Sequence, residues 1–260
     1  MLKILKYTLF DLLRSRWSYI YFGFYLLFAS ALFLLSGDVS KVVISLMNVI
    51  LILCPLIATM FGVMYYYNSR EFIELLLAQP IHRTAIFLGQ YVGLALSLSL
   101  SLLLGIGLPF LFYGLFASAE IWNFFILIGN GILLSFIFSG LAFLIALLND
   151  NKIKGFGLAM VTWLFFAVIY DGLFLLLLLF FRDYPLERFS LGLSILNPID
   201  LSRMLVLLKL DISALMGYTG AVFQLFFGTA WGMGIAFLAL LFWIVLPTLG
   251  IRRVATRKDF

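Results

Sequence analysis

The sequence predicts an all-α polytopic membrane protein with six transmembrane helices. Of its 260 residues, 65% are hydrophobic, 11% are charged and 29 are phenylalanine, whereas soluble domains are about 45–50% apolar. The apolar residues also fall in runs of roughly 20 with few charges, and a run of that length crosses a hydrocarbon core of about 30 Å. Composition and run length together therefore predict the fold class.

We expect a single membrane domain over residues 1–260. Its six spans are predicted at about 17–36, 42–67, 85–117, 121–148, 156–181 and 226–248. Residues 1–16 predict an amphipathic helix that lies in the membrane interface before the first span. Its apolar face is formed by Leu2, Leu5, Leu9, Leu12 and Leu13.

The third predicted span is longer than the bilayer requires. Its roughly 33 residues would extend about 50 Å as an ideal helix, so we expect Gly105, Gly107 and Pro109 to break it. Small residues also recur at every fourth position of this span, and such a stripe lets helix backbones approach closely. The stripe consists of Gly89, Gly93, Ser97, Ser101 and Gly105. It packs either against helices of the same chain or along a pore or dimer seam.

The distribution of basic residues predicts the orientation. Most of the 17 Lys and Arg residues fall in the connections that share a side with the N-terminus. The positive-inside rule therefore places both termini in the cytoplasm, and residues 68–84 and 149–155 with them. Because the basic residues are scattered over short connections, they do not form a nucleic-acid-binding surface.

The long outer connection, 182–225, is too charged to be a seventh span. Its acidic and basic residues include Asp200, Arg203, Lys209 and Asp211, and each would cost about 2.5–3.5 kcal/mol at the membrane centre. Asn197 and Pro198 instead predict a helix N-cap and first helical residue, with Asp200 in the first turn and able to pair with Arg203. We expect amphipathic helices over about 197–217, lying at the outer interface or dipping shallowly into it.

The residues that would carry catalysis are missing. No GxxxxGK[ST], HExxH or GxSxG motif is present and the chain has one His, so we expect no catalytic site and no metal site of its own. Cys54 lies in an apolar run and is expected to be a buried, inert thiol. Met60 and Met64 are one helical turn apart, and adaptable packing is favoured over an incomplete soft-metal site.

Asp171 is the acidic residue that lies deepest within a predicted span. An intramembrane carboxylate is by default a functional candidate, such as a proton relay or polar gate. The alternative is a carboxyl group held by Tyr170 or by a neighbouring backbone, or one placed near the outer end of its helix. The predicted spans supply no second deep ionisable residue for a proton path.

Residues 70–80 predict a short amphipathic helix at the cytoplasmic interface between spans two and three. Phe72, Ile73, Leu76 and Leu77 fall on one face, and Glu71, Glu74 and Ala78 on another. Pro80 ends this helix, and Thr84 is predicted to cap the next span. The helix is either a solvated surface element or a docking site for a soluble subunit, with its charges supplying specificity.

Three motifs carry a family resemblance. They are ELLLAQPIHR at Glu74–Arg83, NPIDLSRML at Asn197–Leu205 and LDISALMGYTGAVF at Leu210–Phe223. With the topology above, they resemble the ABC-2 type transporter permeases, and among these the permease subunits of the Nos systems that mature the copper enzyme nitrous oxide reductase.

The resemblance implies partners and roles. The permease would be a homodimer in the bacterial inner membrane, with separate P-loop ATPase subunits that bind ATP and Mg²⁺, and a periplasmic β-helical copper-handling subunit. Residues 70–80 would be the coupling helix, and the ATPase-docking residues would be Arg70, Glu71, Glu74, Gln79, His82 and Arg83. The outer subunit would contact Asn197, Asp200, Arg203 and Asp211. An ABC-2 exporter of a small or lipidic substrate is the alternative, and a self-contained secondary transporter a more distant one.

Overall fold

The structure is a computed structural model that describes residues 1–36, 39–113, 121–181, 187–209 and 230–257. These residues form helices and short connections, with no strand among them. Six helical stretches within them are long and apolar enough to cross a membrane. They are α2 (Arg16–Ser36), α3 (Val39–Asn68), α5 (Arg83–Phe112), α6 (Ile121–Leu148), Lys152–Phe180 and α12 (Ala230–Arg257). The predicted fold class is confirmed.

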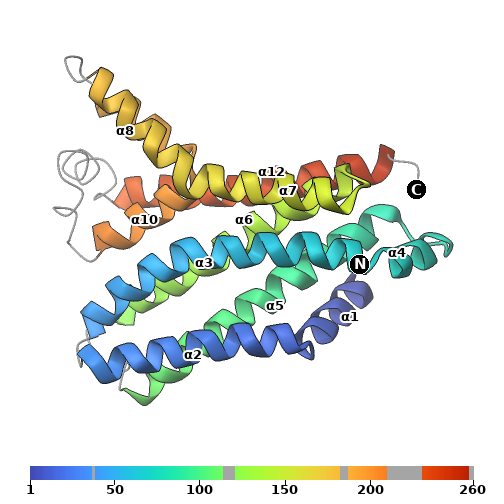
Figure 1. The fold of residues 1–260 in the computed structure, drawn as a ribbon, viewed down its shortest axis with the longest axis horizontal. Helices are drawn as coiled ribbons and strands as arrows, with labels where there is room; N and C mark the ends of the chain where they lie inside the picture. The colour runs from blue at the N-terminus through green and yellow to red at the C-terminus, as the bar shows by residue number, and fades with distance from the viewer. Residues whose placement is uncertain (37–38, 114–120, 182–186, 210–229, 258–260) are drawn as a thin grey trace.

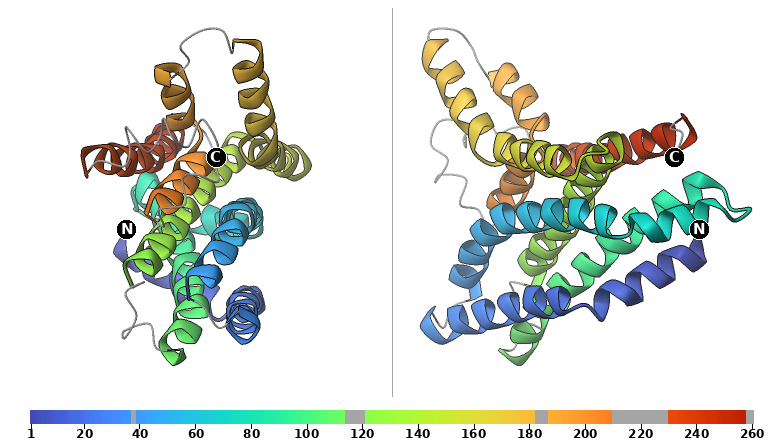
Figure 2. Two further views of the ribbon diagram at one scale, coloured as in Figure 1. Left: turned by 90° about the vertical axis from the view of Figure 1, so that its left-hand side faces the viewer. Right: turned by 45° about the vertical axis from the view of Figure 1, so that its right-hand side comes forward.

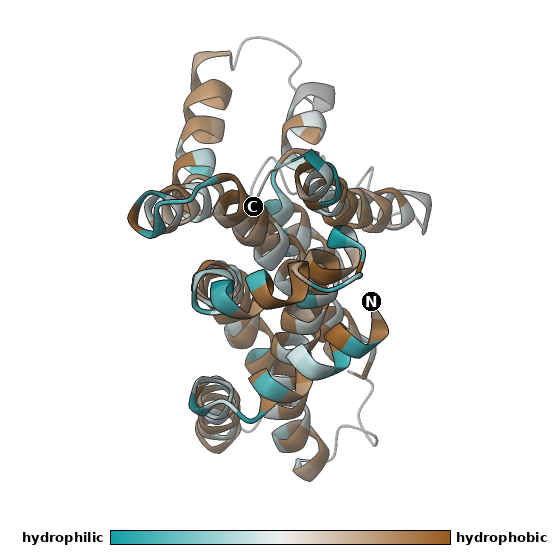
Figure 3. Ribbon diagram, turned by 90° about the vertical axis from the view of Figure 1, so that its right-hand side faces the viewer, coloured by the Kyte–Doolittle hydropathy of each residue, from teal (hydrophilic) through white to brown (hydrophobic). Residues whose placement is uncertain are grey.

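The chain is arranged as a tilted bundle with distinct ends (Figures 1 and 2). Both termini and the short helix α4 (Arg70–Leu77) lie at one end, which we call the termini end. Helix α10 (Pro198–Lys209) lies at the opposite end, called the far end. Figure 3 views the molecule from the termini end, where hydrophilic residues gather on helix ends and connections while the spans behind them are apolar.

Helices α3 and α6 pack together at the centre of the bundle. At Gly62 of α3, a Cβ atom would lie 2.8 Å from the Cβ of Ala142 on α6. Further along the same pair, the Cys54 sulfur lies 3.0 Å from the Ser135 hydroxyl and donates to the Gly131 carbonyl at 3.2 Å. Small residues therefore allow the close backbone approach expected between membrane helices. Cys54 is fully buried, as predicted.

The small-residue stripe of α5 is covered by helices of the same chain. A Cβ atom on Gly93 would lie 2.8 Å from Thr8 of α1 (Leu2–Leu13). A Cβ atom on Gly105 would lie 2.9 Å from Tyr25 of α2. The intervening Ser97 and Ser101 are also buried. The stripe thus packs against helices of the same chain.

Helix α1 corrects one expectation from the sequence. Its buried residues are Ile4, Thr8 and Leu12, whereas Leu2 of the predicted apolar face is 81% exposed. The glycines of α5 create a groove that accepts Ile4 and Thr8, while Leu5, Leu9 and Leu13 of the predicted face are partly buried and Leu12 is buried. The N-terminal helix is therefore part of the bundle.

The break predicted within the third span is absent. Helix α5 continues unbroken to Phe112 through Gly105, Gly107 and Pro109. Buried packing holds it there, because the Phe110 ring contacts Phe33 of α2 at 4.8 Å, and membrane helices tolerate proline where neighbouring helices support the backbone. Residues 114–117 of the predicted span lie outside the described residues.

Helix α12 extends beyond its predicted end at residue 248. It continues to Arg257, with Ile251 and Ala255 buried and Arg252 and Arg253 exposed on the opposite side. The predicted start of this span, at 226–229, lies outside the described residues. The basic C-terminal segment is therefore a helical continuation of the span at the termini end.

The fifth span is continuous but irregular. It consists of α7 (Lys152–Leu164), a π-helical turn η2 (Phe165–Ile169) and α8 (Tyr170–Phe180). Within this described stretch only Gly155 and Ala159 are buried, and α8 extends away from the bundle at the far end (Figure 1). A π turn inside a helix often marks a functional position.

Candidate functional site

Helix α4 presents the two faces that its sequence predicts. Ile73 is buried and Phe72 and Leu76 are partly buried, whereas Glu71 and Glu74 are exposed. An additional apolar residue, Leu75, is 68% exposed on the outward side. The solvent-exposed side of α4 is therefore acidic and contains one leucine, Leu75.

The ends of α4 differ slightly from the prediction. The helix ends at Leu77, before Pro80, and α5 begins at Arg83 with His82, not Thr84, in the N-cap position. His82 is exposed and its side chain makes no capping hydrogen bond. Along the helix, the Arg70 Nε donates to the Glu74 carboxylate at 3.3 Å, and an exposed pair of this kind contributes only about 0.3–0.5 kcal/mol.

Side-chain contacts join α4 and the end of α3 to two other parts of the chain. The rings of Phe72 on α4 and Tyr7 on α1 stack with centroids 5.0 Å apart. The Tyr67 hydroxyl, near the end of α3, donates to the carbonyls of Asn149 at 2.7 Å and Asn151 at 3.2 Å. Since these two residues connect α6 to α7, the region around α4 is in contact with α1 and with the start of α7.

A second group of polar residues lies towards the far end, and we call Asp171, Asn197, Asp200 and Arg203 the polar cluster. One Arg203 amino group, Nη1, donates to Asp171 of α8 at 3.0 Å and to Asp200 of α10 at 3.1 Å. The Asn197 amide donates to the other oxygen of Asp200 at 2.9 Å. A single guanidinium thus bridges carboxylates from two helices.

Local sequence explains how α10 positions these groups. The Asn197 side-chain oxygen accepts the backbone N–H of Ile199 at 3.0 Å, and Pro198 is the first helical residue. This confirms the predicted cap and first turn. The Asn197 amide also donates to the carbonyl of Phe166 at 2.9 Å, so the cap of α10 is bonded directly to the π turn.

The polar cluster holds its charges in a partly dry environment. Asp200 is 7% exposed. Burial raises its pKa to about 7, and the Asp171 carboxylate adds to that increase while the Arg203 guanidinium opposes it. The predicted spans offered Asp171 no ionisable partner. The structure supplies one from α10, because Arg203 lies 32 residues further along the chain and donates to Asp171.

The position of α10 corrects the predicted outer surface. Asn197 is fully buried, and Ile199 and Leu201 are buried in the core that α10 shares with α3, α6 and α12. Asn197 and Asp200 thus make internal contacts and do not form an exposed surface for an outer subunit. Asp211 and the predicted second outer helix up to residue 217 lie outside the described residues. A further helix that was not predicted, α9 (Glu187–Ile195), precedes α10.

Comparison with known proteins points to a class of transporter. No protein-family model matches the chain. The chain is 28% identical over 187 residues to a Pseudomonas aeruginosa protein named "Probable ABC transporter permease protein NosY", covering 69% of this chain and 68% of that protein. A Stutzerimonas stutzeri protein of the same name is 26% identical over 175 residues, covering 65% of this chain and 63% of that protein.

These matches agree with the six-span helical fold. They support an ABC transporter permease subunit, a multi-pass protein of the inner membrane, and an ATPase subunit as its partner. Within that class, the resemblance to the Nos permeases that the three motifs indicate is confirmed by both named relatives.

Proposed function

We propose that this chain is the permease subunit of a Nos-type ABC transporter. It would pass ATP-driven motion from a cytoplasmic ATPase to a periplasmic event, the maturation of the copper sites of nitrous oxide reductase. The observation that carries the proposal is α4, whose exposed acidic face lies at the same end of the bundle as both termini.

Helix α4 has the properties of a docking element for the ATPase. Its eight residues are too few to form a stable helix alone, so Ile73 and the Tyr7–Phe72 stack hold it in place. Leu75 supplies an apolar contact, and Glu71 and Glu74 supply charges that select the partner and its orientation. Gln79, His82 and Arg83 extend this docking surface and are exposed beside it.

The motion would reach the far end along one continuous helical stretch. Tyr67 bonds the end of α3 to Asn149 and Asn151, and α7 begins directly after Asn151. From there the chain is helical to Phe180, and Asp171 lies on it beyond the π turn. A displacement at α4 would therefore act on the Asp171–Arg203 pair and, through it, on α10.

The remaining subunits would use two surfaces. The apolar side chains of α7 and α8, including Leu158, Val161 and Leu176, are exposed in the single chain, and a second copy would cover part of this surface in a homodimer. The periplasmic copper-handling subunit would bind the far end. Because Asn197 and Asp200 are internal, its contacts would come from other residues there.

Site-specific cross-linking tests the docking proposal. The native Cys54 is fully buried, so it gives little background with a hydrophilic reagent. Cysteine at Glu74 or Gln79 should cross-link to a co-expressed P-loop ATPase partner. Cysteine at Leu35, which is 85% exposed near the end of α2, should not. Absence of any cross-link from positions 70–83 would overturn the proposal.

A further inference from the structure

A cavity lies beside α4, where α1, α2 and α3 meet. Its volume is about 440 Å³, which is within the range of small-molecule sites. Two pairs of aromatic rings contribute to its wall: Tyr7 stacks on Phe72 at 5.0 Å, and Trp17 meets Phe61 edge-on at 6.4 Å. None of the contacts described above accounts for this space.

The lining of this cavity changes character along α3. Met60 and Phe61 lie within the span, whereas Asn68 and Ser69 lie at its termini end. Eight residues of helix separate Met60 from Asn68, a distance of about 12 Å. A molecule with an apolar part in the membrane and a polar part at its surface matches this gradient.

The charge of the polar half selects the headgroup. Asp11 of α1 lines the cavity together with the aromatic rings, and the part of the chain that the structure describes gives it no ion-pair partner. A carboxylate next to aromatic faces attracts an ammonium group through charge and cation–π interactions. The polar half therefore suits a cationic amine.

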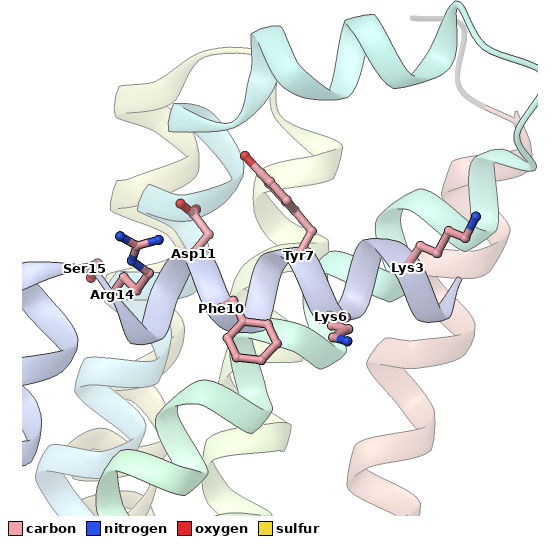
Figure 4. A pocket seen from close by; sticks show the side chains of 7 residues that line it. All are labelled: Lys3, Lys6, Tyr7, Phe10, Asp11, Arg14 and Ser15. Carbon is pink, nitrogen blue, oxygen red and sulfur yellow. The ribbon is translucent and has the colours of Figure 1, made fainter.

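A second hollow adjoins the first and carries the opposite charge. It shares Tyr7, Asp11 and Ser15 with the cavity and is also lined by Lys3, Lys6 and Arg14. Figure 4 shows Tyr7 and Asp11 pointing to the same side of α1, with Lys3 and Arg14 towards its two ends. Lysine and arginine side chains at this position suit a phosphate group.

We infer that the two hollows together bind an ethanolamine phospholipid. Its ammonium group contacts Asp11 and the nearby rings, its phosphate contacts Arg14, which lies one helical turn from Asp11, and an acyl chain follows Met60 and the Trp17–Phe61 pair. A phospholipid with a glycerol headgroup would leave Asp11 without a cation, and a choline headgroup has no N–H to donate to it. The bound lipid would fill the space between α1 and the base of α4.

Native mass spectrometry of the purified full chain tests this inference. The protein is incubated with equal amounts of phosphatidylethanolamine, phosphatidylglycerol and phosphatidylcholine. The unaltered chain should retain phosphatidylethanolamine preferentially. Asp11→Asn should reduce that preference about tenfold, because it removes a charge-assisted hydrogen bond. Asp11 is exposed, so this change leaves the fold intact.

Glu71→Gln is the matched control. Glu71→Gln also removes one exposed acid at the termini end, but Glu71 does not line the cavity, so the preference should be unchanged. Equal retention of the three lipids by the unaltered chain, or an Asp11→Asn chain with undiminished preference, would overturn the inference. Displacement of the lipid by an equal concentration of soluble glycerophosphoethanolamine would also overturn it, because the acyl chain would then contribute nothing.

Discussion

Arg203 of α10 donates to Asp171 of α8 at 3.0 Å and joins the peripheral fifth span to the interior of the bundle. The same Arg203 nitrogen also donates to Asp200 at 3.1 Å. One cation therefore balances two carboxylates. The net charge that remains after a substitution depends on whether Arg203 or one of the two aspartates is replaced. The two helices otherwise meet near the π turn, where Asn197 bonds to the Phe166 carbonyl.

The first prediction concerns the order of stability among variants of this cluster. Arg203→Ala should destabilise the protein more than Asp171→Asn, because it leaves two neighbouring carboxylates without a cation, whereas Asp171→Asn leaves one balanced pair. We expect a loss on the order of 1–3 kcal/mol for Arg203→Ala. Thermal unfolding of the detergent-purified chain measures the order. A larger loss for Asp171→Asn would contradict this account of the charges.

The second prediction is a pH dependence that originates at Asp200. Burial raises its folded-state pKa to about 7, above the value of about 3.9 in an unfolded chain. Between these two values the folded state binds more protons, so its stability should increase as the pH falls from 8 towards 5, by up to about 1.4 kcal/mol per pH unit. Asp200→Asn should remove this contribution, as measured by thermal unfolding across that range.

Glu74→Gln is the control for the pH prediction. Glu74 is an exposed acid on α4, so its replacement should leave the slope of stability against pH unchanged. If Asp200→Asn kept the full slope of the unaltered chain, another group would be the one that titrates.

The third prediction tests the polar cluster in the proposed function. Asp171→Asn should abolish maturation of the reductase while the chain still co-purifies with its ATPase, because docking at α4 is distant from Asp171. Thr162→Val is a control on the same span, since the Thr162 hydroxyl bonds only to the Leu158 carbonyl of its own helix among the described contacts. Normal copper loading of the reductase with Asp171→Asn would assign this residue a purely structural role.

The fourth prediction concerns the contact between α3 and α7. A methyl group on Gly155 would overlap the Tyr67 hydroxyl, which donates to Asn149 and Asn151. Gly155→Ala should therefore cost about 1–3 kcal/mol of stability through overpacking. Adding Tyr67→Phe should recover part of the loss, because it removes the overlapping oxygen.

Gly157 provides the matched control on the same helix. A Cβ atom there would meet nothing within 4 Å, so Gly157→Ala should be neutral or stabilise the helix by up to about 1 kcal/mol. Equal losses from Gly155→Ala and Gly157→Ala in thermal unfolding would show that the Tyr67 contact is not the cause.

Features that depend on local spacing were predictable from the sequence. The faces of α4 follow from the positions of Ile73, Glu71 and Glu74 along one helix, and the start of α10 follows from Asn197 and Pro198. In each case the interaction that decides the structure spans a few residues. The existence of the six spans is similarly local, because it depends on the length of each apolar run.

Features that depend on which helices become neighbours were not predictable. The leucine pattern of α1 did not indicate that Ile4 and Thr8 are its most deeply buried residues together with Leu12, because the groove that receives Ile4 and Thr8 is formed by Gly89 and Gly93 of α5. The break expected at Pro109 is absent because Phe33 of α2 packs on Phe110. In each case the deciding residues belong to another helix, so the sequence of the affected helix alone does not indicate the contact.

By itself, the sequence determined that this chain is a membrane bundle with a short acidic helix between spans two and three, since hydropathy and helical period are properties of contiguous residues. Only the tertiary structure decided that Asp171 has a partner. Arg203 and Asp200 lie on a separate helix, and a contact between distant segments depends on how the whole bundle packs. The same holds for the cavity between Asp11 and Met60, which α1, α2, α3 and α4 form together.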